Sequence, residues 1–401
     1  MAPNRLFEDT HPWLTFKADL SRLSHVVWML LGEAESKCEH LAGAALTPEV
    51  AAELHTVVLT KGIHGTTSIE GNTLSEDEVR RRIEGELELT RSKEYLGTEI
   101  DNILAICNEL ALDLRDGRDV SLTVDRVKEF NRRILDGLPL REGVVPGETR
   151  NDSVVVGISS YRGAPAEDAE LLLDKMVRWL NELVPPAETP EMKFPLAVLK
   201  AIFAHLYIAW IHPFGDGNGR TARMIEFQLM IEAGVPTPAA HLLSNHYNLT
   251  RDKYLIELDK TSRVQGYPTQ GFIQYAIQGL VDQLREQIDI VRAHQLNVTW
   301  VNYVHDNFRD EDTPAKRRQL HLVLDMPAGV SVLKSKLPEV SLRVQNEYVG
   351  KEAKTVTRDI NALLQRRLIV RDGRGYRANR ELIEAFLPVR RTELDVESVA
   401  A

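Results

Sequence analysis

HPFGDGNGRTAR, residues 212–223, places a histidine ahead of three glycines, an aspartate, an asparagine and two arginines. An apolar run precedes this stretch and a helix-forming run, residues 221–230, follows it. We therefore expect a buried helix, a loop and a second helix. Unpaired backbone N–H groups at the start of a helix attract anions, and glycines let the backbone close around one. The stretch predicts a phosphate-binding loop within a mainly α fold.

The polar side chains of the stretch suit the parts of a nucleotide site. His212 has a proton affinity near neutrality, so it can take a proton from an attacking hydroxyl. Arg220 and Arg223 lie three residues apart and add phosphate donors to one helical face. Asp216 offers the hard oxygen ligand that Mg²⁺ prefers when it bridges phosphates. A Walker A loop is excluded because no Gly-Lys-Ser/Thr follows, and His205, inside the apolar run, is expected to be structural.

The composition predicts a globular chain of two or three domains, with 401 residues and 43% apolar content. Only two cysteines, no leader-like stretch and no uninterrupted apolar span near 20 residues predict a cytoplasmic protein without a membrane partner. The formal charge of −10 is uneven, because residues 314–380 carry +9 and the rest carries −19. Such asymmetry favours two modules with different partners.

Helical periodicity covers most of residues 18–310, and one β-branched run interrupts it. This run, residues 153–158, follows Pro146-Gly147 and predicts a short strand or hairpin. Toward the C-terminus, residues 353–368 place apolar side chains on one helical face, and a basic, glycine-containing stretch, residues 369–377, follows. A helix followed by a basic hairpin predicts a winged helix-turn-helix domain.

Two uses of this C-terminal domain stay open at the level of sequence. Lys354, Arg358, Arg371 and Arg374 could contact DNA phosphates, or the domain could dock a protein.

The motif resembles that of the Fic (filamentation induced by cAMP) family, His-x-Phe-x-(Asp/Glu)-Gly-Asn-Gly-Arg-x-x-Arg. Its fixed places are all filled, by His212, Phe214, Asp216, Gly217, Asn218, Gly219, Arg220 and Arg223. The resemblance extends from about Thr66 to about Leu280. It includes the predicted hairpin, which corresponds to a flap that aligns a target segment by strand addition, here Val155, Val156, Gly157 and Ile158.

The resemblance implies transfer of AMP from ATP to a Ser, Thr or Tyr hydroxyl of a protein, with Mg²⁺ as cofactor and pyrophosphate as leaving group. It makes His212 the general base, Phe214 a core anchor of the loop and Asp216 the Mg²⁺ ligand. The residues implied for the nucleotide are Gly215, Asp216, Gly217, Asn218, Gly219 and Arg220 for the phosphate chain, Arg223 for the γ-phosphate and Tyr254 on the adenine side. An Asn often found eight residues after that tyrosine is Ser262 here, which leaves the base preference open.

An upstream segment, TTSIEGN at residues 66–72, resembles the inhibitory motif of the same family, (Ser/Thr)-x-x-x-Glu-(Gly/Asn). Thr66, Glu70 and Gly71 fill its fixed places. The resemblance implies that Glu70 pairs with Arg223 and takes the donor that the γ-phosphate needs.

The sequence patterns predict a mainly α core, a β-hairpin and a C-terminal winged helix, and the resemblance to the Fic family implies an autoinhibited protein adenylyltransferase in which the hairpin is the flap. The expected division is residues 1–95 with the inhibitory motif, 96–295 as catalytic core, 296–313 as connecting helix, 314–390 as winged helix and 391–401 as acidic tail. Two alternatives stay open: a Fic-fold enzyme that transfers phosphate or phosphocholine or removes AMP, and a nucleotide-sensing DNA-binding regulator. The expected partners are ATP and a target protein, and homodimer formation stays open.

Overall fold

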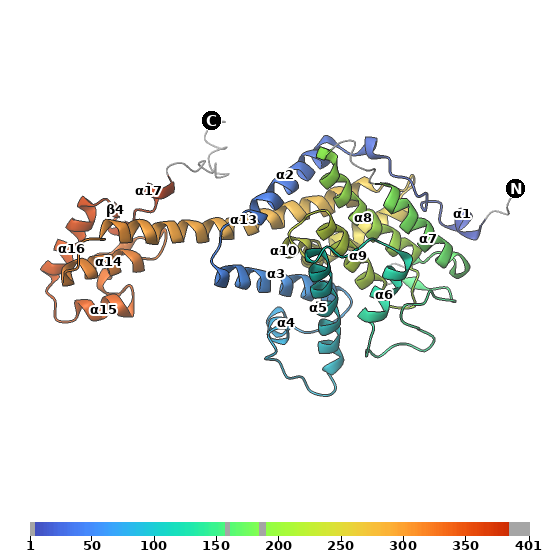
Figure 1. Ribbon diagram of the computed structural model, residues 1–401, viewed down its shortest axis with the longest axis horizontal. Helices are drawn as coiled ribbons and strands as arrows, with labels where there is room; N and C mark the ends of the chain where they lie inside the picture. Colours follow the sequence, from blue (N-terminus) through green and yellow to red (C-terminus); the bar gives the residue numbers. More distant parts are fainter. Residues whose placement is uncertain (1–4, 157–160, 184–189, 385–401) are drawn as a thin grey trace. The chain divides into compact units, whose positions relative to one another are not determined.

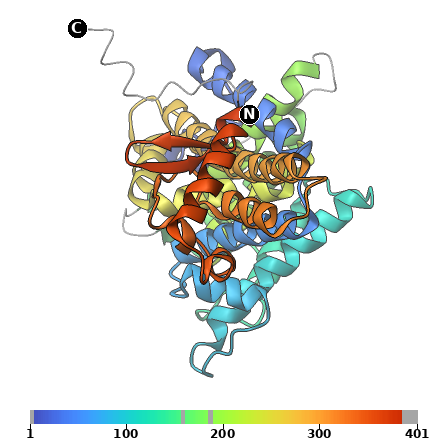
Figure 2. The same ribbon diagram turned by 90° about the vertical axis from the view of Figure 1, so that its left-hand side faces the viewer.

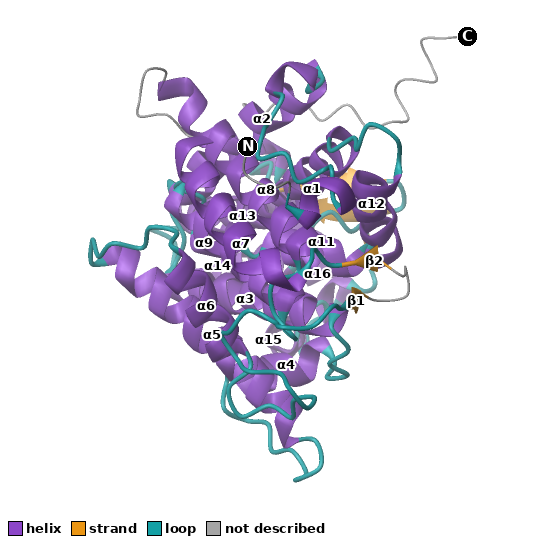
Figure 3. Cartoon of the chain, turned by 90° about the vertical axis from the view of Figure 1, so that its right-hand side faces the viewer, coloured by secondary structure: helices purple, strands orange, loops and turns teal. Residues whose placement is uncertain are grey.

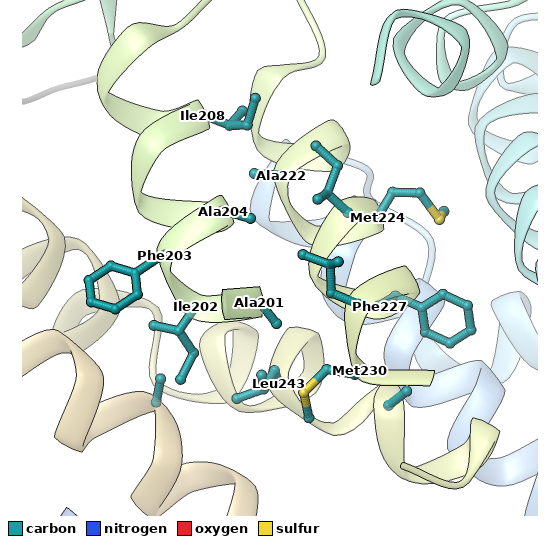
Figure 4. Packing of buried hydrophobic residues seen from close by; sticks show 14 of the residues in the cluster. Ala201, Ile202, Phe203, Ala204, Ile208, Ala222, Met224, Phe227, Met230 and Leu243 are labelled. Atoms are coloured by element: carbon teal, nitrogen blue, oxygen red, sulfur yellow. The ribbon is translucent and has the colours of Figure 1, made fainter. Parts of the chain in front are cut away.

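The apolar run ahead of His212 forms α8 (Lys193–Ile211), which is buried along most of its length. After the loop, α9 (Asn218–Glu232) packs against it in the computed structural model. Ala204 and Ala222 lie between the two helices, where small side chains allow a close approach (Figure 4). A helix that is apolar on all sides belongs in a protein core. Helices α8 and α9 are therefore buried in the core, and they fix the position of the loop that connects them.

The structure describes residues 5–156, 161–183 and 190–384. The chain divides into two compact units, residues 1–289 and 290–401 (Figure 1). The five-part division expected from the sequence is finer than this and stays a prediction. Its acidic tail, residues 391–401, lies outside the described residues.

The N-terminal unit is mainly helical, as predicted. In addition to α8 and α9 its elements are α1 (Leu6–Thr10), η1 (Leu20–Arg22), α2 (His25–Ala42), α3 (Pro48–Ile69), α4 (Glu76–Ile83), α5 (Glu94–Arg115), α6 (Val124–Ile134), β1 (Val155–Val156), β2 (Tyr161–Arg162), α7 (Ala166–Leu183), η2 (Pro190–Met192), α10 (Thr237–Ala240), α11 (Leu242–Leu249), α12 (Arg251–Arg263) and the first half of α13 (Gln270–Asn307). Their apolar faces form one large core. Helices α3, α5 and α6 all contact α9, so residues far apart in sequence meet around the loop.

Local signals in the sequence explain several helix starts. Thr123 caps α6 by accepting a hydrogen bond from the backbone N–H of Arg126. Ser75 and Glu78 form a reciprocal capping box at the start of α4. These caps satisfy N–H groups that the first turn of a helix leaves unpaired.

The predicted hairpin is present at its described positions. Strands β1 and β2 pair antiparallel, with Val155 opposite Arg162 and Val156 opposite Tyr161 (Figure 3). Gly157 and Ile158, the other two predicted flap residues, lie outside the described residues.

The C-terminal unit has its own core and a small sheet. After the end of α13 it contains α14 (Pro314–Asp325), β3 (Val332–Leu333), η3 (Leu337–Glu339), α15 (Leu342–Tyr348), α16 (Ala353–Gln365), β4 (Ile369–Asp372), β5 (Gly375–Ala378) and α17 (Glu381–Glu384). The strands are antiparallel in the order β3-β5-β4. The hairpin of β4 and β5 is drawn in red (Figure 2). Ile360 and Leu363 of α16 are buried on the face that the sequence pattern predicts. The helix and the hairpin thus form where expected, and the winged-helix assignment stays a prediction.

Among the described residues, one segment, Pro190–Ile211, has the length and apolar composition of a membrane-crossing helix. Its most apolar window is 78% buried inside the protein. The burial agrees with the interpretation of this run as a core helix.

Candidate active site

His212 ends α8 in a left-handed conformation, with φ 51° and ψ 58°. Its backbone N–H donates to the Ile208 carbonyl at 2.9 Å, which closes the last turn of the helix. Arg150, which is 7% exposed, donates from Nε to the His212 carbonyl at 2.7 Å and also donates to the Ala164 carbonyl. A buried arginine thus caps the carbonyl end of α8 and fixes the backbone of His212.

Burial and then the nearby Arg150 guanidinium lower the pKa of His212 to about 4. The negative charge of Glu70 opposes this shift without cancelling it. The imidazole is therefore neutral at physiological pH, which is the form that accepts a proton.

The loop between α8 and α9 is held by side-chain amides. The Asn218 side chain accepts from the Phe214 N–H at 2.9 Å and donates to the Phe214 carbonyl at 2.8 Å, and Phe214 itself is buried in the core. From α6, Asn131 donates to the Asp216 carbonyl at 2.9 Å. Gly217 has φ 74° and precedes the first turn of α9, a conformation that favours glycine. The loop is therefore fixed before any ligand binds.

Arg220 lies buried between two carboxylates. It donates from Nη1 to Glu99 Oε1 at 2.5 Å and from Nη2 to Asp216 Oδ1 at 3.2 Å. The Asp216 side chain is 33% exposed, and the Gly217 N–H donates to its Oδ1 at 2.6 Å. Asp216 is thus the more exposed of the two carboxylates. Glu99, the buried one, holds Arg220 on the other side.

Arg223 is 2% exposed, and the segment that resembles the inhibitory motif accepts hydrogen bonds from it. Its Nε donates to Thr66 Oγ1 at 2.8 Å, and its Nη2 donates to the Thr66 carbonyl at 2.9 Å and to Glu70 Oε1 at 2.6 Å. The ion pair that the sequence resemblance implies between Glu70 and Arg223 is therefore present. Burial opposes ionisation of Glu70, but the charge and hydrogen bond of Arg223 outweigh it and lower the pKa of the carboxyl.

The Glu70 carboxylate also lies against the first turn of α9. A Cβ on Gly219 would overlap Glu70 Oε1, so the missing side chain at Gly219 leaves the space that this oxygen fills. The start of a helix carries partial positive charge and attracts anions. A carboxylate of the chain thus occupies the place where a phosphate would be attracted.

Helix α3 is held firmly where it presents Glu70. A Cβ on Gly65 would stand 2.7 Å from the Ser244 carbonyl oxygen, so α3 and α11 approach closely at this glycine. Arg251 donates to the Ile69 carbonyl at 3.1 Å, one residue before Glu70. The end of α3 is therefore anchored by packing as well as by the ion pair.

The adenine-side residue predicted from the resemblance lies in the core. Tyr254 is 4% exposed, its hydroxyl is 3.0 Å from Nε2 of His205, and its ring stacks on Tyr247. His205 is fully buried and its other ring nitrogen is 3.3 Å from Glu226, in agreement with the structural role expected for it. In this arrangement Tyr254 offers little ring surface to a base, and its contact with a nucleotide stays a prediction.

The structure thus brings together His212, the loop glycines, Asp216, Arg220, Arg223, Thr66 and Glu70, as the sequence predicts, while the amide of Asn218 faces its own loop. Sequence reasoning missed Glu99, Asn131 and Arg150. For Glu99 a signal exists: it lies on the face of α5 that carries Leu96 and Ile103, three residues after one and four before the other. A charged residue on an apolar helical face indicates a buried partner.

Known proteins share this region. Residues 121–230 match the model of the Fic/DOC family. The protein adenylyltransferase fic-1 of Caenorhabditis briggsae is 31% identical over 174 residues, which are 43% of this chain and 32% of that protein. Protein adenylyltransferase Fic of Drosophila ananassae is 32% identical over 178 residues, again 43% of this chain and 32% of the relative. The chain thus spans about a third of the length of these curated relatives.

Two solved structures share the fold. A Fic family protein from Desulfovibrio desulfuricans superposes with a TM-score of 0.54 at 17% identity, over 89% of this chain and 96% of that one. Fic-1 from C. elegans gives a TM-score of 0.51 at 21% identity, over 67% of this chain and 74% of that one. Residues 121–230, which include the motif, thus match the Fic/DOC family model, and the chain shares its fold with these two solved structures.

Proposed function

We propose that this protein is an adenylyltransferase that transfers AMP from ATP to a Ser, Thr or Tyr hydroxyl of a target protein and of itself. The observation that carries the proposal is a neutral His212 imidazole beside the anion-attracting start of α9. Both curated relatives described above are named as protein adenylyltransferases, which supports AMP as the transferred group.

In the proposed reaction His212 accepts the proton of the target hydroxyl as its oxygen attacks the α-phosphorus of ATP. A bond forms between that oxygen and the α-phosphorus, the α–β phosphoanhydride bond breaks, and pyrophosphate leaves with the bonding electrons. The imidazole must be neutral to accept the proton, and burial beside Arg150 keeps it so. The fixed loop holds the nucleotide and His212 in position for the reaction, and positioning contributes a large part of catalysis in phosphoryl chemistry.

The phosphate chain would lie along the loop and the first turn of α9. Gly215 and Gly219 are partly exposed and leave room for phosphate oxygens beside the backbone, and Arg220 neutralises charge beside them. Arg223 would hold the γ-phosphate once Glu70 has left it.

The residues of the site fit a Mg²⁺ ion that is shared with a nucleotide. Asp216 supplies one partly exposed carboxylate, and the described residues contain no cluster of three or more side chains able to hold a metal alone. Mg²⁺ in nucleotide sites is commonly held by one or two carboxylates together with phosphates and water. When bound, Mg²⁺ would neutralise phosphate charge, and Asp216 is the residue that would hold it.

We propose that the described arrangement is the inhibited state. The Glu70 carboxylate pairs with Arg223 and fills the space beside Gly219, so it competes with the γ-phosphate for charge and for room. ATP would then bind without Arg223, and its α-phosphorus would not be aligned with the attacking oxygen.

We further propose that the C-terminal unit docks the enzyme onto an acidic partner. Lys354 and Arg358 of α16 and Arg371 and Arg374 of the β4–β5 hairpin are exposed, whereas Arg366 is engaged with Glu311 at 2.6 Å. Steep salt dependence of duplex binding would distinguish DNA from a protein partner.

Two isotope labels test the transferred group. The Glu70→Gly variant is incubated with Mg²⁺ and with ATP labelled at the α- or the γ-phosphate, and the protein is then analysed by intact-mass spectrometry. AMP transfer predicts incorporation of the α-label alone and a mass gain of one AMP group. Incorporation of the γ-label would instead establish phosphate transfer.

A further inference from the structure

Glu99 is a buried carboxylate at the back of the candidate site, with 7% of its surface exposed. Its Oε1 accepts from Arg220 at 2.5 Å and its Oε2 accepts from the Asn72 side chain at 2.8 Å. Its neighbours on the same face of α5, Leu96 and Ile103, are apolar and buried. A carboxylate in such surroundings is costly unless both of its oxygens are paired, and here both are.

The contact with Arg220 controls how that arginine meets Asp216. Arg220 shares its guanidinium between Glu99 and Asp216, and its Nε has no partner among the described residues. Without the charge of Glu99, the guanidinium would be free to form a two-pronged ion pair with Asp216, the geometry that arginine and carboxylate prefer. That pair would compete with a cation for the Asp216 carboxylate.

The contact with Asn72 connects Glu99 to the inhibitory segment. Asn72 follows Glu70 by two residues, its side chain also donates to the Leu96 carbonyl at 3.0 Å, and its backbone N–H donates to the Thr67 carbonyl at 3.1 Å. These side-chain hydrogen bonds attach the turn after α3 to α5. The segment is linked to α9 by two sets of hydrogen bonds. One runs from Glu70 to Arg223, and the other runs from Asn72 through Glu99 to Arg220.

We propose that Glu99 is a positioning residue of the nucleotide site, which holds Arg220 off Asp216 and ties the turn that carries Glu70 to the motif. The inference rests on the proposed function. It adds to that function a residue that touches neither ATP nor the reacting hydroxyl and acts through Arg220.

The first experiment measures the ATP and Mg²⁺ requirements of Glu99→Gln in the Glu70→Gly background, where inhibition is absent. Replacing a charged partner of Arg220 by a neutral one of the same shape should raise both the KM for ATP and the Mg²⁺ concentration for half-maximal rate by about tenfold, with kcat changed less. Glu99→Asp keeps the charge and should stay within about threefold of the parent, whether or not Glu99→Gln folds well.

Asp101→Asn is the matched control, because Asp101 lies two residues further along α5 and pairs with Arg82 at 2.6 Å, away from the motif. It should leave both requirements unchanged. Equal ATP and Mg²⁺ requirements in Glu99→Gln and Asp101→Asn would overturn the positioning role. The same comparison can be made when no transfer occurs, by adding His212→Ala to each protein and measuring ATP affinity by calorimetry. Failure of the proposed function is thereby distinguished from failure of the inference.

The second experiment tests the tie to the inhibitory turn. Asn72→Ala in the otherwise unchanged chain should raise the rate of self-modification severalfold, because the turn loses its side-chain hydrogen bonds to α5. In the Glu70→Gly background the same change should add nothing, since the carboxylate that it releases is already absent. An unchanged basal rate in Asn72→Ala, or an equal gain in both backgrounds, would overturn this half of the proposal.

Discussion

Replacement of Glu70 by glycine should activate the enzyme. The change removes the carboxylate that binds Arg223 at 2.6 Å and lies beside Gly219, and it adds no bulk at the start of α9. The Glu70 side chain is 29% exposed and Arg223 is buried, so the charge-assisted hydrogen bond is only partly screened by water. Such a bond contributes roughly 1.5–3 kcal/mol, which corresponds to about ten- to a hundredfold in the population of the productive state.

The assay is self-modification measured by intact-mass spectrometry at saturating ATP and Mg²⁺. The expected rate of Glu70→Gly exceeds that of the unchanged chain by at least about tenfold. Glu84→Gly is the matched control, because Glu84 is also the residue that caps a helix C-terminus, at the end of α4, and it pairs with Arg80 at 3.0 Å at the surface. The control should not change the rate. Equal rates for Glu70→Gly and the unchanged chain would refute the inhibitory role of the ion pair.

Three further predictions concern the base, the metal and the C-terminal unit. Because the pKa of His212 is lowered to about 4, the transfer rate of Glu70→Gly should be constant from roughly pH 6 to 8. It should decline only in more acidic buffer, as the imidazole gains a proton. A transfer rate that titrates near pH 6.5 would contradict this. Asp216→Ala should abolish transfer and remove the effect of Mg²⁺ on ATP affinity in calorimetry, and full activity in a chelator would argue against the assigned ligand. The 401-residue chain should bind duplex DNA with affinity that falls steeply as salt rises and that weakens in the Arg371→Ala, Arg374→Ala double variant. Absence of binding at low salt would favour a protein partner.

The elements of the fold that carry a clear repeat could be predicted from the sequence. The one-sided pattern of α16 shows a helical period, and the all-round apolar run that becomes α8 is long enough to favour a helix over a strand. Strand β3 has two residues, Val332 and Leu333, which is too short for an alternating pattern, and its place is set by pairing with β5. Such a strand depends on its partner more than on its own composition.

Some parts of the candidate site could likewise be predicted from the sequence, and others could not. The loop from His212 to Arg223 is local in sequence, so its anion-binding character follows from residue types and spacing. Glu99 lies 121 residues before Arg220, and Arg150 lies 62 residues before His212. Only the packing of α5 and of the loop before β1 around α8 and α9 brings these side chains to the motif. The apolar face around Glu99 indicates that it has a buried partner, but no local pattern identifies that partner as Arg220.

The central claim, that His212 is the base for AMP transfer, is tested most directly by one comparison. Glu70→Gly and the double variant with His212→Ala are each incubated with ATP labelled at the α-phosphate, and both label incorporation and ATP affinity are measured. The account predicts that the double variant binds ATP with nearly the affinity of Glu70→Gly, because other groups hold the phosphates, and incorporates no label. Incorporation by the double variant at a rate close to that of Glu70→Gly would contradict the account.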